Sequence, residues 1–196
     1  MSELKNRYPK TIDCEGRVIE LSLLSSMDVE SALKFTTKFA DHDILAFNRD
    51  IQEPKVLEAW GKSIEQGEII SIVAAMNSEI VGTTAVLLDK KSWSAHVGEL
   101  RILVSPDARG LGLGRALIQE SFLIGLDHGL EKLTARMTLD QEGAIAIFED
   151  LGFKTEALLK DHAKDRNGGK HDLLMLSHDV AGVQSMMQAY GVDEAF

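Results

Sequence analysis

The stretch VSPDARGLGLGRALI, residues 104–118, determines how the rest of this 196-residue chain is interpreted. A run of β-formers ends at Val104, a turn follows at Ser105 and Pro106, and alternating glycines lead directly into an apolar helical pattern. The N–H groups of a first helical turn have no intrahelical partners and lie at the positive end of the helix dipole, where they bind anions. Glycine lets a phosphate approach closely because it has no β-carbon. We therefore expect a phosphate-bearing ligand, the alternative being a glycine turn without a ligand.

Two common nucleotide-binding motifs do not match this stretch. A P-loop requires G-x-x-x-x-G-K-[ST], and no such string occurs in the chain. A dinucleotide-binding fingerprint requires G-x-G-x-x-G, whereas Gly110, Gly112 and Gly114 form G-x-G-x-G. Both nucleotide interpretations are therefore excluded.

Hydrophobic periodicity on both sides of the glycines predicts a domain of the α/β (α+β) class. Helical spacing predicts helices at 29–40, 54–66, 108–129 and 144–152, with an acidic loop at 41–53. Apolar or alternating runs predict strands at 17–24, 68–76, 79–89, 96–104, 130–140, 153–162 and 170–180. The predicted order of elements is βααβββαβαββ.

Two motifs then resemble those of one family. Residues Arg109 to Gly114 have the form R-x-x-G-x-G and resemble the [QR]-x-x-G-x-[GA] signature of the GNAT superfamily of acyl-CoA-dependent N-acyltransferases. QEGAIAIFEDLGF, residues 141–153, is similar to the family's N-x-x-A-x-x-x-Y-x-x-x-G-F segment and matches it at Ala144, Gly152 and Phe153. The resemblance covers about residues 17–180. It implies a GNAT fold, a mixed and mostly antiparallel twisted sheet of about seven strands flanked by about four helices.

The resemblance also implies where coenzyme A binds. Its pyrophosphate is expected on the loop from Arg109 to Gly114, with Arg109 and Arg115 as nearby positive charges. The pantetheine arm is expected to pair with the backbone at the end of the preceding strand. The implied cofactor-binding residues are Ile102, Leu103, Val104, Arg109, Gly110, Leu111, Gly112, Leu113, Gly114, Arg115, Gln141 and Phe148.

The chemistry implied by the resemblance is attack of an uncharged amine on a thioester. A base must remove a proton from the amine, and donors must hold the oxyanion that forms. The resemblance makes Glu99 the candidate base, because family members often place a glutamate on this strand facing the acceptor. Half-burial beside apolar neighbours would raise the pKa of Glu99 toward a useful value. The alternative is a solvated strand carboxylate or a partner for Arg101.

The sequence departs from the family pattern at two positions. Phe148 stands where a tyrosine usually protonates the leaving thiolate, and Phe148 has no hydroxyl. Gln141 stands at the asparagine position, which keeps the amide and changes its reach. Water could protonate the leaving group, because a thiolate with a pKa near about 8.5 leaves acceptably without an acid.

Further polar residues on two segments could take part in acceptor binding. His162 and His171 lie on the last two predicted strands and could act as a base or orient one another, the alternative being hydrogen-bonded surface residues. The loop between the first two helices carries four acids, which would form an acidic lip that attracts a polycation or a peptide amine. The alternative for these acids is solubility and helix capping. They are Asp41, Asp43, Asp50 and Glu53.

Composition limits the partners of the chain. Thirty-one acidic and 21 basic residues give a net charge of -10, which disfavours binding to nucleic acid or to an anionic membrane. No apolar run reaches the length of a membrane span, and the first ten residues lack the apolar core of a signal peptide. A single cysteine excludes an internal disulfide, and no H-x-x-x-H or C-x-x-C spacing predicts a metal site. We expect a cytoplasmic protein without a metal.

The expected organisation is one GNAT domain between two short ends. Residues 1–16 are polar and are interpreted as an N-terminal arm of low order, residues 17–180 as the acetyltransferase domain, and residues 181–196 as a C-terminal tail. The tail has an amphipathic pattern that fits packing on its own domain or a homodimer contact, the latter by analogy with some relatives.

The function implied by the resemblance is transfer of an acetyl group from acetyl-CoA to a primary amine of a small molecule or peptide, by direct attack in a ternary complex. An alternative, suggested by Phe148, is a GNAT fold that binds acyl-CoA as a sensor or scaffold with little transferase activity.

Overall fold

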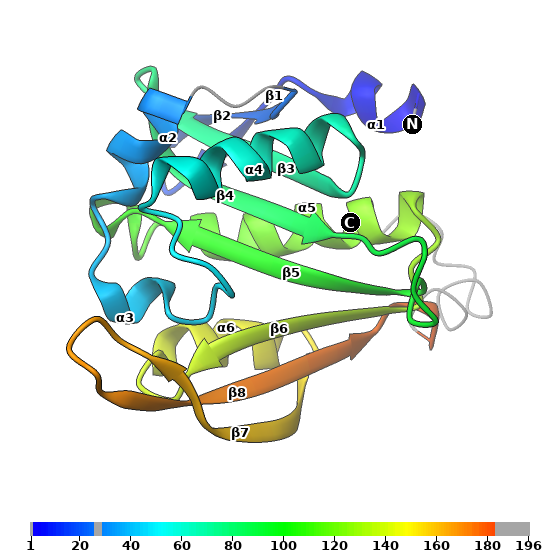
Figure 1. The fold of residues 1–196 in the computed structure, drawn as a ribbon. Helices are drawn as coiled ribbons and strands as arrows, with labels where there is room; N and C mark the ends of the chain where they lie inside the picture. Colours follow the sequence, from blue (N-terminus) through cyan, green and yellow to red (C-terminus); the bar gives the residue numbers. More distant parts are fainter. Residues whose placement is uncertain (1, 26–28, 183–196) are drawn as a thin grey trace.

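An eight-stranded mixed sheet forms the centre of the computed structural model, which describes residues 2–25 and 29–182 (Figure 1). Its spatial order is β1-β2-β3-β4-β5-β6-β8-β7. The strands are β1 (Lys10–Cys14), β2 (Arg17–Leu23), β3 (Ile69–Met76), β4 (Glu79–Leu87), β5 (Val97–Val104), β6 (Lys132–Thr138), β7 (Lys154–Lys164) and β8 (Lys170–Asp179). The helices are α1 (Ser2–Arg7), α2 (Val29–Thr36), α3 (Asp41–Ile44), α4 (Pro54–Glu65), α5 (Leu113–Asp127) and α6 (Glu142–Asp150), with a 3₁₀ turn at Pro106–Ala108.

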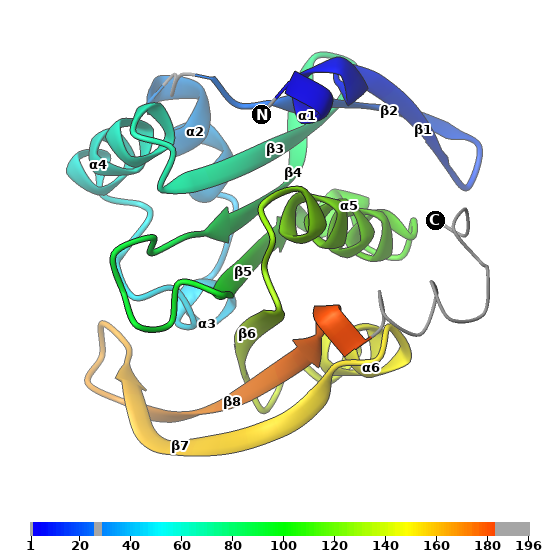
Figure 2. The same cartoon turned by 90° about the vertical axis from the view of Figure 1, so that its right-hand side faces the viewer.

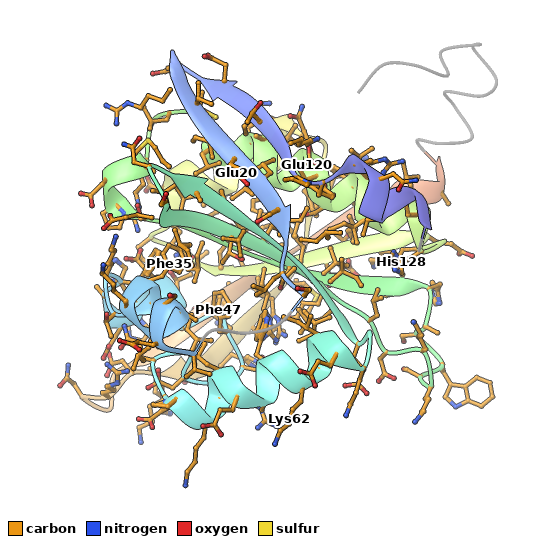
Figure 3. All side chains as sticks on the ribbon, turned by 90° about the horizontal axis from the view of Figure 1, so that it is seen from above. Glu20, Phe35, Phe47, Lys62, Glu120 and His128 are labelled. Carbon is orange, nitrogen blue, oxygen red and sulfur yellow. The ribbon has the colours of Figure 1, made fainter. Side chains whose placement is uncertain are left out.

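Two helical layers cover the sheet. In Figure 2, α2 and α4 lie on one face and α5 and α6 on the other. The apolar side of α5 fills the larger core through Leu117, Ile118 and Ile124, which pack with Leu133 of β6. A smaller core lies under α2 and α4, where Phe35, Phe39, Ile44, Ile51 and Leu57 surround Leu103 of β5. In Figure 3, Phe35 and Phe47 lie on the α4 side of the sheet, and Glu120 lies on the opposite side.

The parallel pair formed by β5 and β6 interrupts an otherwise antiparallel sheet. The pairing runs from Val97 opposite Lys132 to Leu100 opposite Ala135 and ends there. Beyond this point the two strands diverge toward α3, as Figure 1 shows. The sheet therefore opens between β5 and β6 while remaining continuous elsewhere.

The predicted order of elements is confirmed from β2 onward, with differences at two places. The segment expected as a loop at 41–53 contains the short helix α3. The N-terminal residues add α1 and β1, so the sheet has eight strands rather than seven. Within the described residues there are six α-helices rather than four.

The interpretation of residues 1–16 as an arm of low order is wrong for the described part of this segment. Strand β1 pairs with β2 over its full length, and Leu4, Tyr8 and Cys14 are buried. Lys10 Nζ lies 2.6 Å from Glu120 Oε1, and the Tyr8 hydroxyl donates to the other oxygen of the same carboxylate. Only alternate residues of this edge strand face the protein, and the residues between them are polar. The sequence of β1 therefore lacks the apolar run that would have predicted a strand. The expectations for the tail beyond residue 182 lie outside the described residues, and its boundary stays a prediction.

Among the helices that the structure describes, none combines the length and the apolar character needed to cross a lipid bilayer.

His178 of β8 is buried among aromatic rings and predicts a pH-dependent stability. The centre of its ring lies 4.5 Å from the ring centre of Phe122 and 5.3 Å from that of Phe153. Its Nδ1 has no hydrogen-bond partner in the structure. Burial lowers the pKa of His178 below 6.5; Asp179 acts to raise this pKa and Lys154 to lower it. The unfolded chain therefore binds a proton at a higher pH than the folded chain, and stability is lost as the pH falls below about 6.5.

When the pH falls from about 7.5 to about 5.5, we expect the unsubstituted protein to lose more free energy of unfolding than His178→Leu. The difference between the two losses should be about 1 kcal/mol. Urea unfolding at both pH values measures the difference. Exposed His96, replaced by leucine, is the matched control and should leave the pH dependence unchanged. Equal pH dependence in His178→Leu and the unsubstituted protein would contradict the assignment.

Candidate active site

A cleft of about 740 Å³ lies where β5 and β6 separate. On the α5 side it is lined by the glycine turn and by the start of α6. On the α2 side it is lined by Phe39, His42 and Phe47. The cleft therefore connects the two faces of the sheet through the gap between the diverging strands.

The glycine turn forms the α5 end of this cleft. Gly110 and Gly112 have φ angles of 80° and 74°, a left-handed conformation that favours glycine. A β-carbon at either position would have no other protein atom within 4 Å. The first-turn N–H groups of α5 have no intrahelical acceptor, and Gly112 has no side chain that could accept from them. This open, donor-rich backbone has the room and polarity that a phosphate group requires.

The edge of β5 toward β6 has backbone groups available for a ligand. Residues up to Val104 pair with β4 on the other side, whereas the ladder with β6 ends at Leu100. Ile102, Leu103 and Val104 all line the cleft. An extended ligand could therefore pair with β5 at this edge, as the sequence resemblance predicts.

Three charged side chains on neighbouring strands line the part of the cleft on the α2 side, and we call them the charged floor: Glu99 and Arg101 of β5 and Arg136 of β6. Asp43 and Asp140 also line the cleft. Glu99 Oε1 accepts a hydrogen bond from Arg101 Nε at 2.9 Å. The other oxygen of Glu99 lies 2.8 Å from Arg136 Nη2. The carboxylate of Glu99 therefore lies between two arginines rather than beside apolar neighbours, and the expected contact with Arg101 is present. The role of Glu99 as a base stays a prediction.

Arg101 is fixed by two aromatic side chains. Its guanidinium carbon lies 5.5 Å from the ring centre of Phe47 and 5.7 Å from that of Trp60. Trp60 is held in turn by a hydrogen bond from its Nε1 to Ser71 Oγ. These contacts stabilise the cation and limit the directions in which Arg101 can donate.

Comparison with known proteins decides the family. A sequence profile described as the acetyltransferase (GNAT) family matches residues 36–153, more than half of the chain. The chain belongs to this family. GNAT acetyltransferases use acetyl-CoA and act on amine groups of small molecules or peptides.

Individual relatives agree with the GNAT assignment. Mycothiol acetyltransferase of Paenarthrobacter aurescens strain TC1 is 38% identical over 58 residues, which cover 29% of this chain and 18% of that protein. A Salmonella typhimurium protein solved with its cofactor acetyl-CoA superposes with a TM-score of 0.67 at 17% identity, covering 82% of this chain and 94% of that one. Ribosomal-protein-S5-alanine acetyltransferase of Vibrio fischeri gives a TM-score of 0.70 at 15% identity, covering 87% and 96%. At such identities the solved structures establish the GNAT fold alone.

The two positively charged residues of the GNAT loop both have carboxylate partners. Arg109 Nη2 lies 3.0 Å from Asp43 Oδ1, and Arg115 Nη2 donates to Asp150 Oδ2 at 2.9 Å. Both arginine side chains remain substantially exposed. All predicted cofactor-binding residues line the cleft except Leu111, which packs beside the larger core.

The two departures from the GNAT pattern occupy defined positions at α6. Phe148 lines the cleft and is buried against Phe153, with ring centres 4.8 Å apart. Gln141 Oε1 accepts a hydrogen bond from the backbone N–H of Thr138 at 3.1 Å, so this amide braces the turn between β6 and α6. Neither side chain can supply a proton to a leaving thiolate.

The predicted histidines lie outside the residues that line the cleft. His162 is exposed and borders a separate cavity of about 330 Å³ under the β7–β8 hairpin. His171 Nε2 lies 2.8 Å from Asp165 Oδ2. For His171 the structure therefore favours the alternative of a hydrogen-bonded surface residue. The catalytic role of His162 stays a prediction.

The acidic lip expected at 41–53 is partly neutralised, because two arginines pair with three of its four acids. Arg166 lies in the β7–β8 turn. Its Nη1 is 2.5 Å from Asp41 Oδ1, and its Nη2 is 2.6 Å from Asp50 Oδ2. Burial acts to raise the pKa of Asp50, but the hydrogen bonds from Arg166 and from the backbone N–H of Gln52, together with the charge of Arg166, outweigh burial and lower this pKa. Because Arg109 also pairs with Asp43, three of the four acids hold neighbouring segments together.

Sequence reasoning missed several residues of this site, chiefly Arg136, Phe47 and Asp140, all of which line the cleft. Alternation in β6 carried part of the signal, because Leu133, Ala135 and Met137 are buried and place Arg136 on the opposite face. Among the residues at 2–25 and 29–182, no group of three His, Cys, Asp or Glu side chains could hold a metal ion.

Proposed function

We propose that this GNAT protein binds acetyl-CoA in the cleft and transfers the acetyl group to a primary amine of a small molecule or peptide, by direct attack in a ternary complex. The observation that carries the proposal is a single cleft joining the glycine turn to the charged floor through the gap between β5 and β6. Donor and acceptor sites on opposite faces of a sheet can meet only at such a gap.

The glycine turn and the edge of β5 hold acetyl-CoA in this proposal. The N–H groups around Gly112 and the first turn of α5 bind the pyrophosphate. The edge of β5 beyond Leu100 pairs with the pantetheine arm and directs the thioester toward the gap. Acetyl-CoA supplies the thioester carbon that the amine attacks.

Glu99 is the proposed base, acting directly or through one water. A C–N bond forms and the C–S bond breaks, one proton leaves the amine nitrogen, and one proton reaches the thiolate sulfur. Phe148 has no hydroxyl, so water supplies the proton to sulfur in this proposal. A thiolate is stable enough to leave without a protein side chain acting as the acid, because the pKa of a thiol is about 8.5.

The direct test is calorimetric titration of the purified protein with acetyl-CoA and with ATP. We expect a dissociation constant for acetyl-CoA on the order of 10 µM, and no binding of ATP, because ATP carries phosphates without an arm that pairs with β5. Absence of heat with both ligands would contradict the proposed phosphate site. Equal affinity for both would mean that the pantetheine arm contributes nothing.

A second candidate function is an acyl-CoA sensor or scaffold with little turnover. It is favoured by the apolar Phe148 at the position where GNAT relatives usually have a tyrosine. Both functions predict binding of acetyl-CoA, and only the transferase predicts amine-dependent release of the CoA thiol. The cytoplasmic location and a homodimer stay predictions.

A further inference from the structure

The charged floor contains more positive than negative charge. Arg101 and Arg136 have side chains only 10% and 15% exposed, and both face the one carboxylate of Glu99, which is 24% exposed. Within the described ranges, no other carboxylate lies within ion-pair distance of either guanidinium. An unmatched cation in a partly desolvated cleft is costly unless a ligand supplies the counter-charge.

The geometry of the floor restricts what that ligand can be. Aromatic rings hold Arg101 in place, and its Nε is already used on Glu99. Arg136 uses Nη2 toward Glu99 and keeps further N–H donors. Arginine binds planar carboxylates with parallel N–H donors, so an acceptor carboxylate suits this position.

The phosphates of acetyl-CoA are not the missing anion in this arrangement. The proposed phosphate site is the glycine turn at the start of α5, and α5 covers one face of the sheet (Figure 2). The arginines belong to the opposite face, because their strand neighbours Leu100 and Ala135 are buried in the α5-side core. Asp43 and Asp140 also line the cleft, but neither forms an ion pair with these two arginines. A molecule in the α2-side part of the cleft is therefore well placed to supply the counter-charge.

We propose that the acceptor is an amine that also carries a carboxylate, that is, an amino acid or a close analogue. Its carboxylate binds Arg136, assisted by the charge of Arg101, and its amine lies beside Glu99. Alternating charges in the order Arg101, Glu99, Arg136, at contact distances of 2.9 and 2.8 Å, complement the adjacent charges of a zwitterion. The inference rests on the proposed transferase function and specifies its substrate.

The remaining walls and the net charge agree with a small amino acid. Phe39, Ala46 and Phe47 line the same part of the cleft and suit an apolar side chain. The whole chain carries a net charge of -10 and repels anions at long range, so a carboxylate needs local arginines. The amine of a long peptide lies far from its terminal carboxylate and does not match so compact a floor.

The test compares acceptors that differ only in the carboxylate. Release of CoA thiol is followed with a panel of L-amino acids, including leucine and phenylalanine, and with the amines obtained by removing the carboxylate from each. We expect kcat/KM for the best amino acid to exceed that of its matched amine by about 30-fold, because the amine brings no counter-charge for the second arginine of the floor. The amino acid amides should behave as the amines do.

Variants then assign the effect to the floor. In Arg136→Gln, KM for the amino acid should rise about 30-fold and the preference over the matched amine should disappear. Arg136→Lys keeps the charge and should restore part of the preference. Arg7→Gln removes another arginine–carboxylate pair, Arg7 with Asp127 outside the cleft, and is the control for general loss of an ion pair. Thermal unfolding of each variant verifies that it folds.

Three outcomes would overturn the inference. One is transfer to a matched amine at a rate equal to or above that of its amino acid, which would leave the transferase function intact. Another is an unchanged preference in Arg136→Gln. The third is an absence of both turnover and calorimetric binding of N-acetyl amino acids to the CoA-loaded protein. Failure of acetyl-CoA itself to bind would instead contradict the proposed function, so the two failures are distinguishable.

Discussion

Replacing Glu99 with glutamine is expected to lower kcat about 1,000-fold, since glutamine keeps the size of the side chain and cannot accept a proton. The affinity for acetyl-CoA should change little, because the phosphate and pantetheine contacts proposed above involve the glycine turn and the edge of β5. Steady-state thiol release with a saturating amine gives kcat, and calorimetry gives the affinity.

A matched control separates loss of a base from loss of an ion pair. Glu156 of β7 is an exposed strand glutamate whose carboxylate contacts Lys132 Nζ at 2.8 Å, outside the cleft. Glu156→Gln should leave kcat unchanged. If Glu99→Gln also retained full kcat with each acceptor tested, Glu99 would be a partner of the two arginines and not a base.

Replacing Gly112 with leucine is expected to weaken acetyl-CoA binding about 100-fold. The β-carbon at this position has no protein neighbour within 4 Å and projects from a residue that lines the cleft. A larger side chain there would occupy the space proposed for the pyrophosphate and would screen the N–H groups of the first turn of α5. Calorimetric titration of the variant with acetyl-CoA measures the loss.

Gly67 supplies the control for backbone strain. It follows α4 with a φ of 68°, and a β-carbon there also has no neighbour within 4 Å. Gly112→Leu and Gly67→Leu should therefore destabilise the fold to a similar extent, by about 1–2 kcal/mol. Only Gly112→Leu should lose affinity, and full affinity in that variant would mean that the phosphate site lies elsewhere.

Several parts of the fold and site could be predicted from the sequence because they depend on neighbouring residues. Alternation and helical spacing gave the elements from β2 onward in the right order. The glycine turn was predicted from its composition, since left-handed φ angles and a bare helix start are properties of Gly110 and Gly112 themselves. The replacement of a tyrosine by Phe148 was also visible, because it needs only a motif and a position.

The sequence by itself therefore determined the order of elements, the glycine turn and the family resemblance, and tertiary structure alone decided which charges meet. Alternation places Glu99 and Arg136 on a face of each strand, yet only the pairing of β5 with β6 brings them together. Arg166 contacts Asp41 across 125 residues of chain and offsets part of the negative charge of a loop that is acidic in the sequence. The strength of an ion pair depends on the distance between its charges in space. A sequence pattern predicts the face of the strand on which a side chain lies, but not the residue that it contacts.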